Sequence, residues 1–312
     1  MHIISRNLPG RKDRQLHHSM RRNWDLYLLI VPVVVYFAIF HYAPMYGVQI
    51  AFRKYSAGLG ITGSRWVGLD NFRRFFNSYY CVRLIRNTLL TSLYDLAVGF
   101  PIPIILALIM NEVGPRFKKA AQTITYAPHF LSTVVLVSML NAFLRTDIGL
   151  VNKVITGMGG EAIYFTGEPG WFRTIYVLSG VWQHMGWSSI IYISALSGID
   201  TALYEAGRVD GATRWQMMTR ITLPSLLPTI TIMLIMNAGQ VMSVGFEKVF
   251  LMQNDLNIST SDVISTYVYR SGMINAEFSF SAAVGLFNSG INCILLFVVN
   301  AIARRIGETS LW

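Results

Sequence analysis

Charge is scarce in this chain. Only 13% of its 312 residues are charged, whereas 53% are hydrophobic and the mean hydropathy is +0.44. This composition excludes an ordinary soluble protein and indicates a protein of the lipid bilayer. Acidic residues are scarcer than basic ones, 16 against 26, which gives a net charge of +10. The basic residues form no stripe interleaved with aromatics, so we expect membrane lipid as a partner and no nucleic acid.

Motifs of catalysis are also missing. The only two cysteines, Cys81 and Cys293, lie far apart and show no metal-ligand spacing, so we expect neither a disulfide framework nor a metal site. No GxxxxGK[ST] phosphate-binding loop occurs, so the chain is not expected to bind and hydrolyse ATP itself. No nucleophile lies in a convincing arrangement with a base. We therefore expect a protein that is not an enzyme, with no catalytic residue and no cofactor of its own.

Long apolar runs are the main feature of the sequence. Each is near or above the roughly 20 residues that a spanning helix needs. We therefore predict an all-α, polytopic integral membrane protein with a single transmembrane domain, residues 24–303, between tails at residues 1–23 and 304–312. Its six transmembrane helices are expected at about Trp24–Ala43, Asn87–Met110, Ala121–Leu144, Thr174–Leu196, Ser225–Phe246 and Ser281–Ala303.

The basic residues favour one orientation of these helices. Lysine and arginine cluster in the N-terminal tail, around residues 116–119 and at Arg304 and Arg305, all of which lie on one side of a six-helix topology. Such clusters mark cytoplasmic segments. We expect both termini to be cytoplasmic.

A polar stretch, Tyr204 to Pro224, separates the fourth and fifth apolar runs. Asp200 can cap a helix over about residues 201–209, and Gly211 can end that helix and turn the chain. A second helical run, at about 212–221, then leads to Pro224, where a helix tolerates the missing amide hydrogen. These signals alone also suit an ordinary surface loop. We predict two short helices on the membrane surface within residues 200–224.

The order and spacing of this loop resemble the EAA loop of ABC importer permeases. The matching positions are Glu205, Ala206, Gly207, Asp210, Gly211, Ala212, Ile221, Leu223 and Pro224. The family usually has alanine where this chain has Gly207, and glycine weakens a helix interior by about 1 kcal/mol. In that family the short helix fits a cleft on a cytoplasmic ATPase subunit. The resemblance therefore implies that these residues couple the chain to an ATPase.

The similarity extends along nearly the whole chain. Segments such as Ala43–Gly47, Arg86–Leu89, Asp262–Tyr267 and Gly307–Trp312 resemble the LplB-type branch of the carbohydrate, maltose-permease-like permeases. The resemblance implies a type I ABC importer permease fold with a cytoplasmic EAA coupling helix, in the inner membrane of a bacterium. The branch includes a permease of an alginate oligosaccharide importer. The implied substrate is thus an oligosaccharide or polysaccharide, with alginate as the specific candidate.

The same resemblance implies the partners. They are a second homologous permease, two ABC ATPase subunits that bind ATP and Mg, and an extracytoplasmic solute-binding protein. Transport would proceed by alternating access, with this chain forming half of the translocation path.

Polar residues gather in the last three predicted spans, as a path for sugar requires. Amides exchange hydrogen bonds with hydroxyls, and an indole face can cover the apolar face of a pyranose. The alternative for each residue is hydrogen bonding between helices. The candidate path residues are Tyr176, Gln183, Trp187, Asn237, Gln240, Glu247, Asn288 and Asn292.

Asp95 is the one acidic residue well inside a predicted span. An intramembrane carboxylate is a functional candidate, although water or a neighbouring residue can also satisfy it. Other functions remain open: an ion-coupled secondary carrier, which would need a relay of such groups, an ABC permease for a solute other than sugar, or a membrane receptor or enzyme that uses the polar loop.

Overall fold

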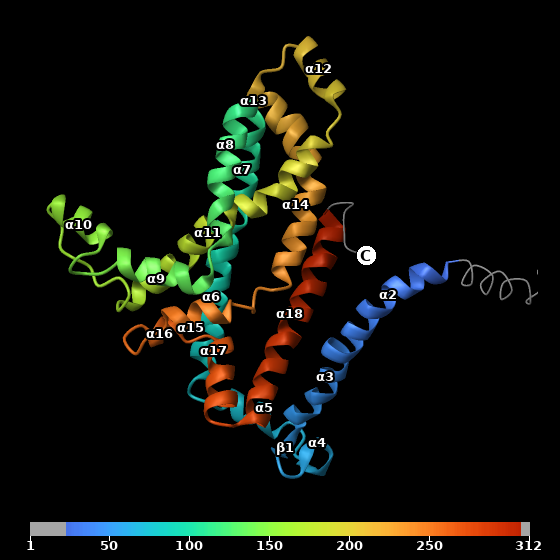
Figure 1. The fold of residues 1–312 in the computed structure, drawn as a ribbon, viewed down its shortest axis with the longest axis vertical. Coiled ribbons are helices and arrows are strands. Elements are labelled where there is room, and N and C mark those ends of the chain that lie inside the picture. The colour runs from blue at the N-terminus through green and yellow to red at the C-terminus, as the bar shows by residue number, and fades with distance from the viewer. Residues whose placement is uncertain (1–22, 307–312) are drawn as a thin grey trace, which may run out of the picture.

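The computed structural model describes residues 23–306. The predicted tails therefore lie largely outside the described residues, namely residues 1–22 at the N-terminus and 307–312 at the C-terminus. The first half of the described chain is helical apart from two short strands (Figure 1). Its elements are α2 (Trp24–Phe37), η1 (Ala38–Tyr42), α3 (Ala43–Met45), η2 (Tyr46–Phe52), β1 (Arg53–Ser56), α4 (Gly60–Gly63), β2 (Ser64–Trp66), α5 (Asp70–Phe76), α6 (Cys81–Gly99), α7 (Pro101–Glu112), α8 (Pro115–Tyr126) and η3 (Ala127–Phe130).

The second half of the described chain is helical throughout, with turns between the elements. Its turns η4 and η5 are π-helical, as is η1 in the first half. The elements are α9 (Thr133–Phe143), α10 (Leu150–Gly157), α11 (Pro169–Ser197), α12 (Thr201–Val209), α13 (Arg214–Met217), η4 (Met218–Thr222), α14 (Leu223–Ala238), α15 (Phe246–Met252), α16 (Ile258–Ser261), α17 (Ile264–Tyr269), η5 (Arg270–Ile274) and α18 (Phe278–Ile306).

Helix α11 lies at the centre of the bundle, where it packs against α6, α7, α8 and α14. A core cluster including Ile104, Tyr192 and Leu226 fills the space between α7, α11 and α14. Helix α18 packs on α14, α5 and η2. A second cluster around Phe75, Met242 and Phe280 fixes the other end of α18.

Four helical segments of the described chain are long and apolar enough to cross a membrane: Trp24–Phe52, Cys81–Glu112, Arg214–Ala238 and Phe278–Arg305. A fifth results if the bent pair Pro115–Phe130 and Thr133–Phe143 is one span. The predicted span at 174–196 lies within α11, which is one unbroken helix of 29 residues. It is not among these segments because polar residues interrupt its apolar run.

The predicted helix Ala121–Leu144 is not continuous. Between Pro115–Phe130 and Thr133–Phe143 the chain bends by 99°. Pro128 removes an amide donor in the turn η3, and Ser132 starts α9 by accepting a hydrogen bond from the Val135 amide at 3.4 Å. The prediction of a single helix is wrong here because a proline and a new N-cap follow each other closely.

The predicted span Ser225–Phe246 also ends early. Helix α14 stops at Ala238, and the chain turns before α15 begins at Phe246. Asn292 of α18 holds this turn, since its Oδ1 accepts a hydrogen bond from the Met242 amide and its Nδ2 donates to Ser243 Oγ, both at 2.8 Å. A side chain distant in sequence therefore fixes where the span ends.

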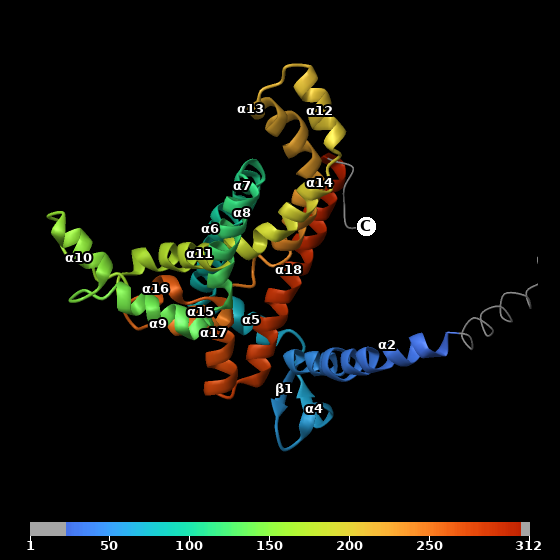
Figure 2. The ribbon, with the colours of Figure 1, turned by 45° about the horizontal axis from the view of Figure 1, so that its top comes forward.

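Helix α2 stands apart from the bundle in both ribbon views (Figures 1 and 2). None of the residues in its most apolar stretch is buried within the chain. Its continuation η2 packs against α18 and joins it to the rest of the protein. The long apolar surface of α2 is thus available to lipid or to another subunit.

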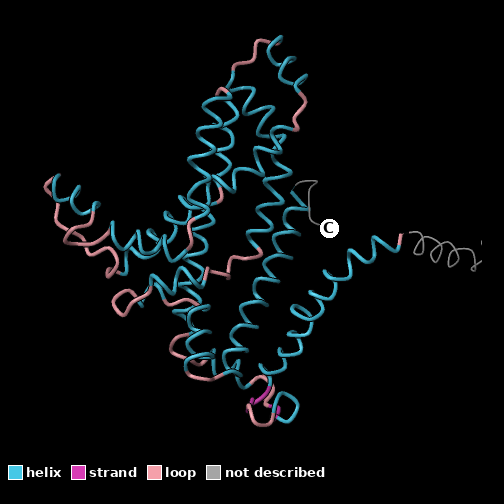
Figure 3. Tube along the Cα trace, viewed as in Figure 1, coloured by secondary structure: helices cyan, strands magenta, loops and turns pink. Residues whose placement is uncertain are grey.

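A small antiparallel hairpin lies at the end opposite α12 (Figure 3). Strands β1 and β2 pair with Arg53 opposite Trp66, and the guanidinium of Arg53 lies 5.5 Å from the Trp66 ring centroid. The all-α prediction therefore missed one two-stranded sheet. The strands have only four and three residues, too few for an alternating pattern to be recognised.

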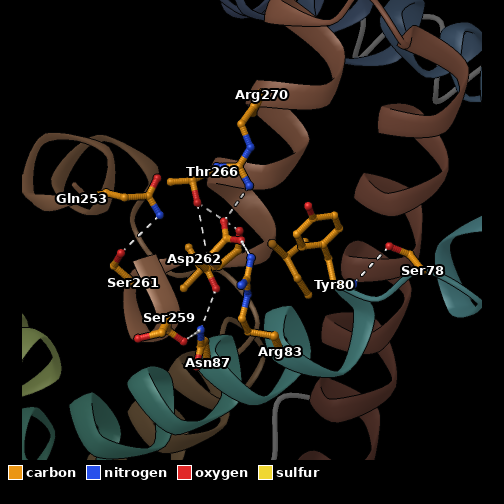
Figure 4. A network of polar contacts seen from close by, with 12 residues as sticks. Ser78, Tyr80, Arg83, Asn87, Gln253, Ser259, Ser261, Asp262, Thr266 and Arg270 are labelled. Atoms are coloured by element: carbon orange, nitrogen blue, oxygen red, sulfur yellow. Dashed lines mark hydrogen bonds and ion pairs between the residues drawn. The ribbon is translucent and has the colours of Figure 1, made fainter. Parts of the chain in front are cut away.

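A buried carboxylate holds the segment after α16 to α6 (Figure 4). Asp262 is fully buried, and its two oxygens accept hydrogen bonds from Arg83 at 2.8 Å and Arg270 at 2.9 Å. Asn87 Nδ2 donates to the Asp262 carbonyl at 3.0 Å, while Asn87 Oδ1 accepts from Arg173 of α11 at 2.9 Å. Three separate parts of the chain meet at this network.

Candidate coupling loop and transport cavity

The polar loop folds into two short helices, as predicted. Asp200 caps α12, because its Oδ1 accepts a hydrogen bond from the Ala202 amide at 2.9 Å. The helix ends at Val209, and Gly211 turns the chain with a φ of +73°, a conformation that favours glycine. Local signals in the sequence were sufficient to find both ends of this helix.

The second helix starts two residues later than predicted, at Arg214. Thr213 caps it through a capping box with Gln216, whose Oε1 accepts a hydrogen bond from the Thr213 amide at 2.8 Å. Helix α13 continues through the π-turn η4 directly into α14, with Pro224 as the second residue of α14. The loop and the membrane helix α14 therefore form one helical rod.

Two contacts hold α12 against this rod. The hydroxyl of Tyr204 lies 2.9 Å from Oγ1 of Thr222, which is almost fully buried. Gly207 faces Ile221 and Met217, and a Cβ at this glycine would lie 3.3 Å from Ile221 Cδ1. The position where this chain departs from the EAA pattern is thus a point where α12 packs closely against α13 and η4.

The outer surface of the loop is open. Glu205, Ala206 and Asp210 are exposed, and so are the large apolar side chains of Val209 (87%) and Trp215 (68%). In both ribbon views α12 projects from one extremity of the molecule (Figures 1 and 2). Exposed apolar residues beside charged ones are typical of a protein contact surface.

A cavity of about 430 Å³ lies between α6, α11, α14 and α15. Its polar lining residues are Thr91, Ser92, Asp95, Tyr176, His184, Ser188, Tyr192, Asn237, Gln240, Ser243 and Lys248. The volume falls within the roughly 300–1,000 Å³ of small-molecule pockets.

Three of the predicted path residues, Tyr176, Asn237 and Gln240, line this cavity. Glu247 is exposed at the start of α15 and is not part of the lining. The turn after α14 accounts for this difference, because it takes the chain away from the helical course on which the prediction placed Glu247.

The remaining path residues lie outside the cavity lining. Gln183 is buried and donates to the Leu131 carbonyl at 2.8 Å, and Trp187 stacks on His129 with ring centroids 4.5 Å apart. Asn292 holds the turn after α14, and Asn288 has a buried Oδ1 with no hydrogen-bond partner among the described residues. Gln183, Trp187 and Asn292 thus contact other segments of the same chain.

The cavity also contains residues that the sequence did not indicate. His184 and Ser188 follow Tyr176 at eight and twelve positions, so the lining face of α11 is a four-residue repeat beginning at Tyr176. Lys248 reaches the cavity from α15, and its Nζ donates to the Tyr176 carbonyl at 2.8 Å. A four-residue step along α11 from Tyr176 indicates His184 as a lining residue. The prediction instead followed the mixed three- and four-residue spacing to Gln183 and Trp187.

A helical membrane protein in which one helix links a polar cavity to an exposed, capped loop has the architecture of a transporter permease. The chain belongs to the family of binding-protein-dependent transport system inner membrane components, whose model matches residues 99–308. It is accordingly a multi-pass protein of the inner membrane.

Relatives cover almost its whole length. The chain is 43% identical to protein LplB of Bacillus subtilis over 94% of its own length and 93% of that protein. It is also 43% identical to YteP of Bacillus subtilis, a permease of a polygalacturonan/rhamnogalacturonan transport system, with coverage of 92% and 90%.

Solved structures agree with the fold. A crystal structure of a bacterial ABC transporter that imports the acidic polysaccharide alginate matches with 41% identity and a TM-score of 0.86, over 94% of this chain and 99% of that one. The alginate transporter in complex with an alginate pentasaccharide-bound periplasmic protein matches with 41% identity and a TM-score of 0.87, over 95% and 100%. The expected type I ABC permease fold follows from this homology.

Proposed function

We propose that this chain is the permease subunit of an ATP-driven, binding-protein-dependent importer and forms half of the path for an acidic oligosaccharide. The observation that carries this proposal is the continuous rod α13–η4–α14. It places the EAA-like loop at one end and the cavity residue Asn237 at the other. A motion of the loop can therefore reach the cavity wall.

Acidic sugar is the substrate class that the relatives support. YteP belongs to a polygalacturonan/rhamnogalacturonan transport system, and the two alginate transporter structures handle a polymer described as acidic. These polymers share carboxylate-bearing sugar rings. We infer a uronate-containing oligosaccharide for this chain, with alginate as one member of the class.

The proposed assembly contains a second homologous permease, two ABC ATPase subunits and an extracytoplasmic binding protein. The exposed surface of α12 and α13 would dock an ATPase subunit, and the uncovered apolar surface of α2 suits contact with lipid or with the second permease. ATP and Mg would be bound by the ATPase subunits, and this chain would hold no cofactor and catalyse no reaction.

The proposed topology has six crossings with both termini in the cytoplasm. The four qualifying segments, the bent pair Pro115–Phe143 and helix α11 supply these six. With this arrangement the EAA-like loop faces the cytoplasm and the hairpin faces outward, toward the binding protein.

The proposed mechanism is alternating access. The loaded binding protein docks outside, ATP draws the two ATPase subunits together, and the bound loop moves with them. Glu205, Ala206, Gly207, Asp210, Gly211 and Ala212 form the docked part, whereas Ile221, Leu223 and Pro224 pass the motion to α14. The cavity then opens outward and receives the sugar, and hydrolysis returns it to the inward-facing state.

A glycine substitution tests this mechanism. Gly211→Val forces a β-branched residue into a φ of +73°, which strains the loop. In proteoliposomes containing the complete transporter we expect oligosaccharide uptake to fall at least tenfold while the variant still inserts and co-purifies with the second permease. The matched control is Gly114→Val, because Gly114 has a φ of −64° and a Cβ there meets nothing within 4 Å. Unchanged uptake by Gly211→Val would contradict the coupling role.

Substrate class is tested in the same preparation. Wild-type transporter should take up oligogalacturonate or alginate oligosaccharides in an ATP-dependent manner and should take up neutral maltooligosaccharides of the same length far more slowly. Uptake of the neutral series alone would refute the acidic-sugar proposal.

A further inference from the structure

The cavity contains one basic and one acidic side chain that do not meet. Among its lining residues, Lys248 is the only lysine or arginine and Asp95 is the only aspartate or glutamate. The ion pairs within the described chain all involve other side chains, so Lys248 and Asp95 form no salt bridge with each other. Asp95 is open to the cavity and accepts no hydrogen bond from any described residue. Both side chains therefore line the same open cavity, and each can still form hydrogen bonds with a ligand.

Lys248 is held in place from one side. Its Nζ donates to the Tyr176 carbonyl at 2.8 Å and lies 4.7 Å from the Tyr176 ring centroid. Gly180, one turn further along α11, makes room for it, because a Cβ there would lie 3.2 Å from Nζ. An ammonium group has three N–H donors, and one is used, so two remain for a ligand.

The two charged groups require different chemistry from a ligand. Charges away from bulk water are costly unless they are paired or hydrogen-bonded. The free ammonium donors of Lys248 suit a carboxylate. The Asp95 carboxylate can only accept hydrogen bonds, so it suits hydroxyl groups and repels a second carboxylate. A sugar acid presents a carboxylate on one side of its ring and hydroxyls on the other.

We infer that Lys248 and Asp95 form a two-point binding site for a single uronate ring within the cavity. Lys248 binds the ring carboxylate and determines acidic specificity, and Asp95 accepts hydrogen bonds from the ring hydroxyls. This inference rests on the proposed function, since it assigns the residues that select the proposed substrate. The Asp95 carboxylate also offsets the positive charge of Lys248. The site therefore binds the uronate weakly enough to release it.

The test compares two substrates that differ only in the carboxylate. Uptake of an acidic oligosaccharide and of its carboxyl-reduced, neutral form is measured in proteoliposomes of the complete transporter. Lys248→Gln should lower uptake of the acidic form by about tenfold or more, because it removes a charged hydrogen bond. Uptake of the reduced form should be unchanged. Lys153→Gln, which removes an exposed lysine of α10, is the matched control and should change neither.

Variants of Asp95 and Gly180 test the same binding site independently of Lys248→Gln. Asp95→Ala should lower uptake of the carboxyl-reduced form, because its hydroxyls lose their acceptor and it has no carboxylate for Asp95 to repel. Gly180→Ala should shift the acidic-to-neutral ratio in the direction of Lys248→Gln, because its Cβ would lie 3.2 Å from Nζ and moves the ammonium by a few tenths of an ångström. This variant remains informative if Lys248→Gln fails to assemble.

Two results would overturn the inference. One is an equal loss of both substrates in Lys248→Gln, which indicates a structural role for the lysine. The other is an unchanged ratio in Gly180→Ala. Failure of the proposed function is distinguishable, because the wild-type transporter would then take up neither oligosaccharide with ATP present, or only the neutral form.

Discussion

Gly186 of α11 is a position where close backbone packing leaves no room for a side chain. A Cβ at this residue would lie 2.1 Å from the backbone carbonyl oxygen of Thr125 and 2.4 Å from its carbonyl carbon. Ordinary contact begins at 3.4 Å, so the first distance falls short by about 1.3 Å (3.4 − 2.1). The obstacle is backbone, so no side-chain rotation relieves it, and Gly186→Ala must push α11 away from α8.

This displacement has a calculable cost. Overpacking a close helix contact costs about 1–3 kcal/mol. The shift also breaks the hydrogen bond from Gln183 Nε2 to the Leu131 carbonyl, and a buried amide left unpaired costs about 1–3 kcal/mol. Together these contributions give about 2–6 kcal/mol for Gly186→Ala.

The measurement is the half-life of the purified transporter at elevated temperature, because large membrane complexes unfold irreversibly. If the folded state bears about 3 kcal/mol of the strain, unfolding accelerates roughly a hundredfold. The control is Gly290→Ala in α18, an exposed helical glycine whose added Cβ meets nothing within 4 Å. Equal half-lives for the two variants would refute the close approach of α11 and α8.

Two further predictions concern the loop and the polar network. Tyr204→Phe removes the hydroxyl that meets Thr222, so we expect less sugar transported per ATP hydrolysed with normal assembly, and Thr222→Val should give the same defect. If Tyr204→Phe keeps the wild-type ratio, the contact transmits no motion. Asp262→Ala leaves two arginines without their buried carboxylate, and because those arginines are 28% and 34% exposed we expect a loss near the lower end of the range for such pairs, about 3 kcal/mol, measured as a shorter thermal half-life. Asp70→Ala, which breaks an exposed pair at 3.6 Å, should change little, and equal stability of the two variants would contradict the prediction.

The coupling loop was the part of the molecule best predicted from sequence, because its determinants are local. The cap at Asp200, the positive φ at Gly211 and the proline at the start of α14 each act within a few residues. The same reasoning predicts the apolar spans, since length and hydropathy are also local properties. Whether the loop docks an ATPase stays a prediction until the variants are measured.

The cavity could be predicted only in part, because its walls come from distant segments. Tyr176, Asn237 and Gln240 were found as polar residues within helices. Lys248 was missed because the turn that returns it to the cavity depends on Asn292 in another helix. Asp95 was found as a lone acidic residue. The sequence of its own helix does not reveal that Lys248 of α15 lines the same cavity. Non-local packing therefore decides which polar residues share the site.

Helix α14 connects the polar loop at residues 200–224 to the cavity. Thr222 at its base contacts α12, and Asn237 near its other end lines the cavity. The fifteen-residue separation corresponds to roughly 22 Å of helix at 1.5 Å per residue. When the loop tilts, we expect the far end of a helix of this length to move, because its base is held by the contact with Tyr204. We propose that the turn after Ala238 carries that motion to Lys248, so that docking of a partner at the loop would change the separation of Lys248 and Asp95 across the cavity.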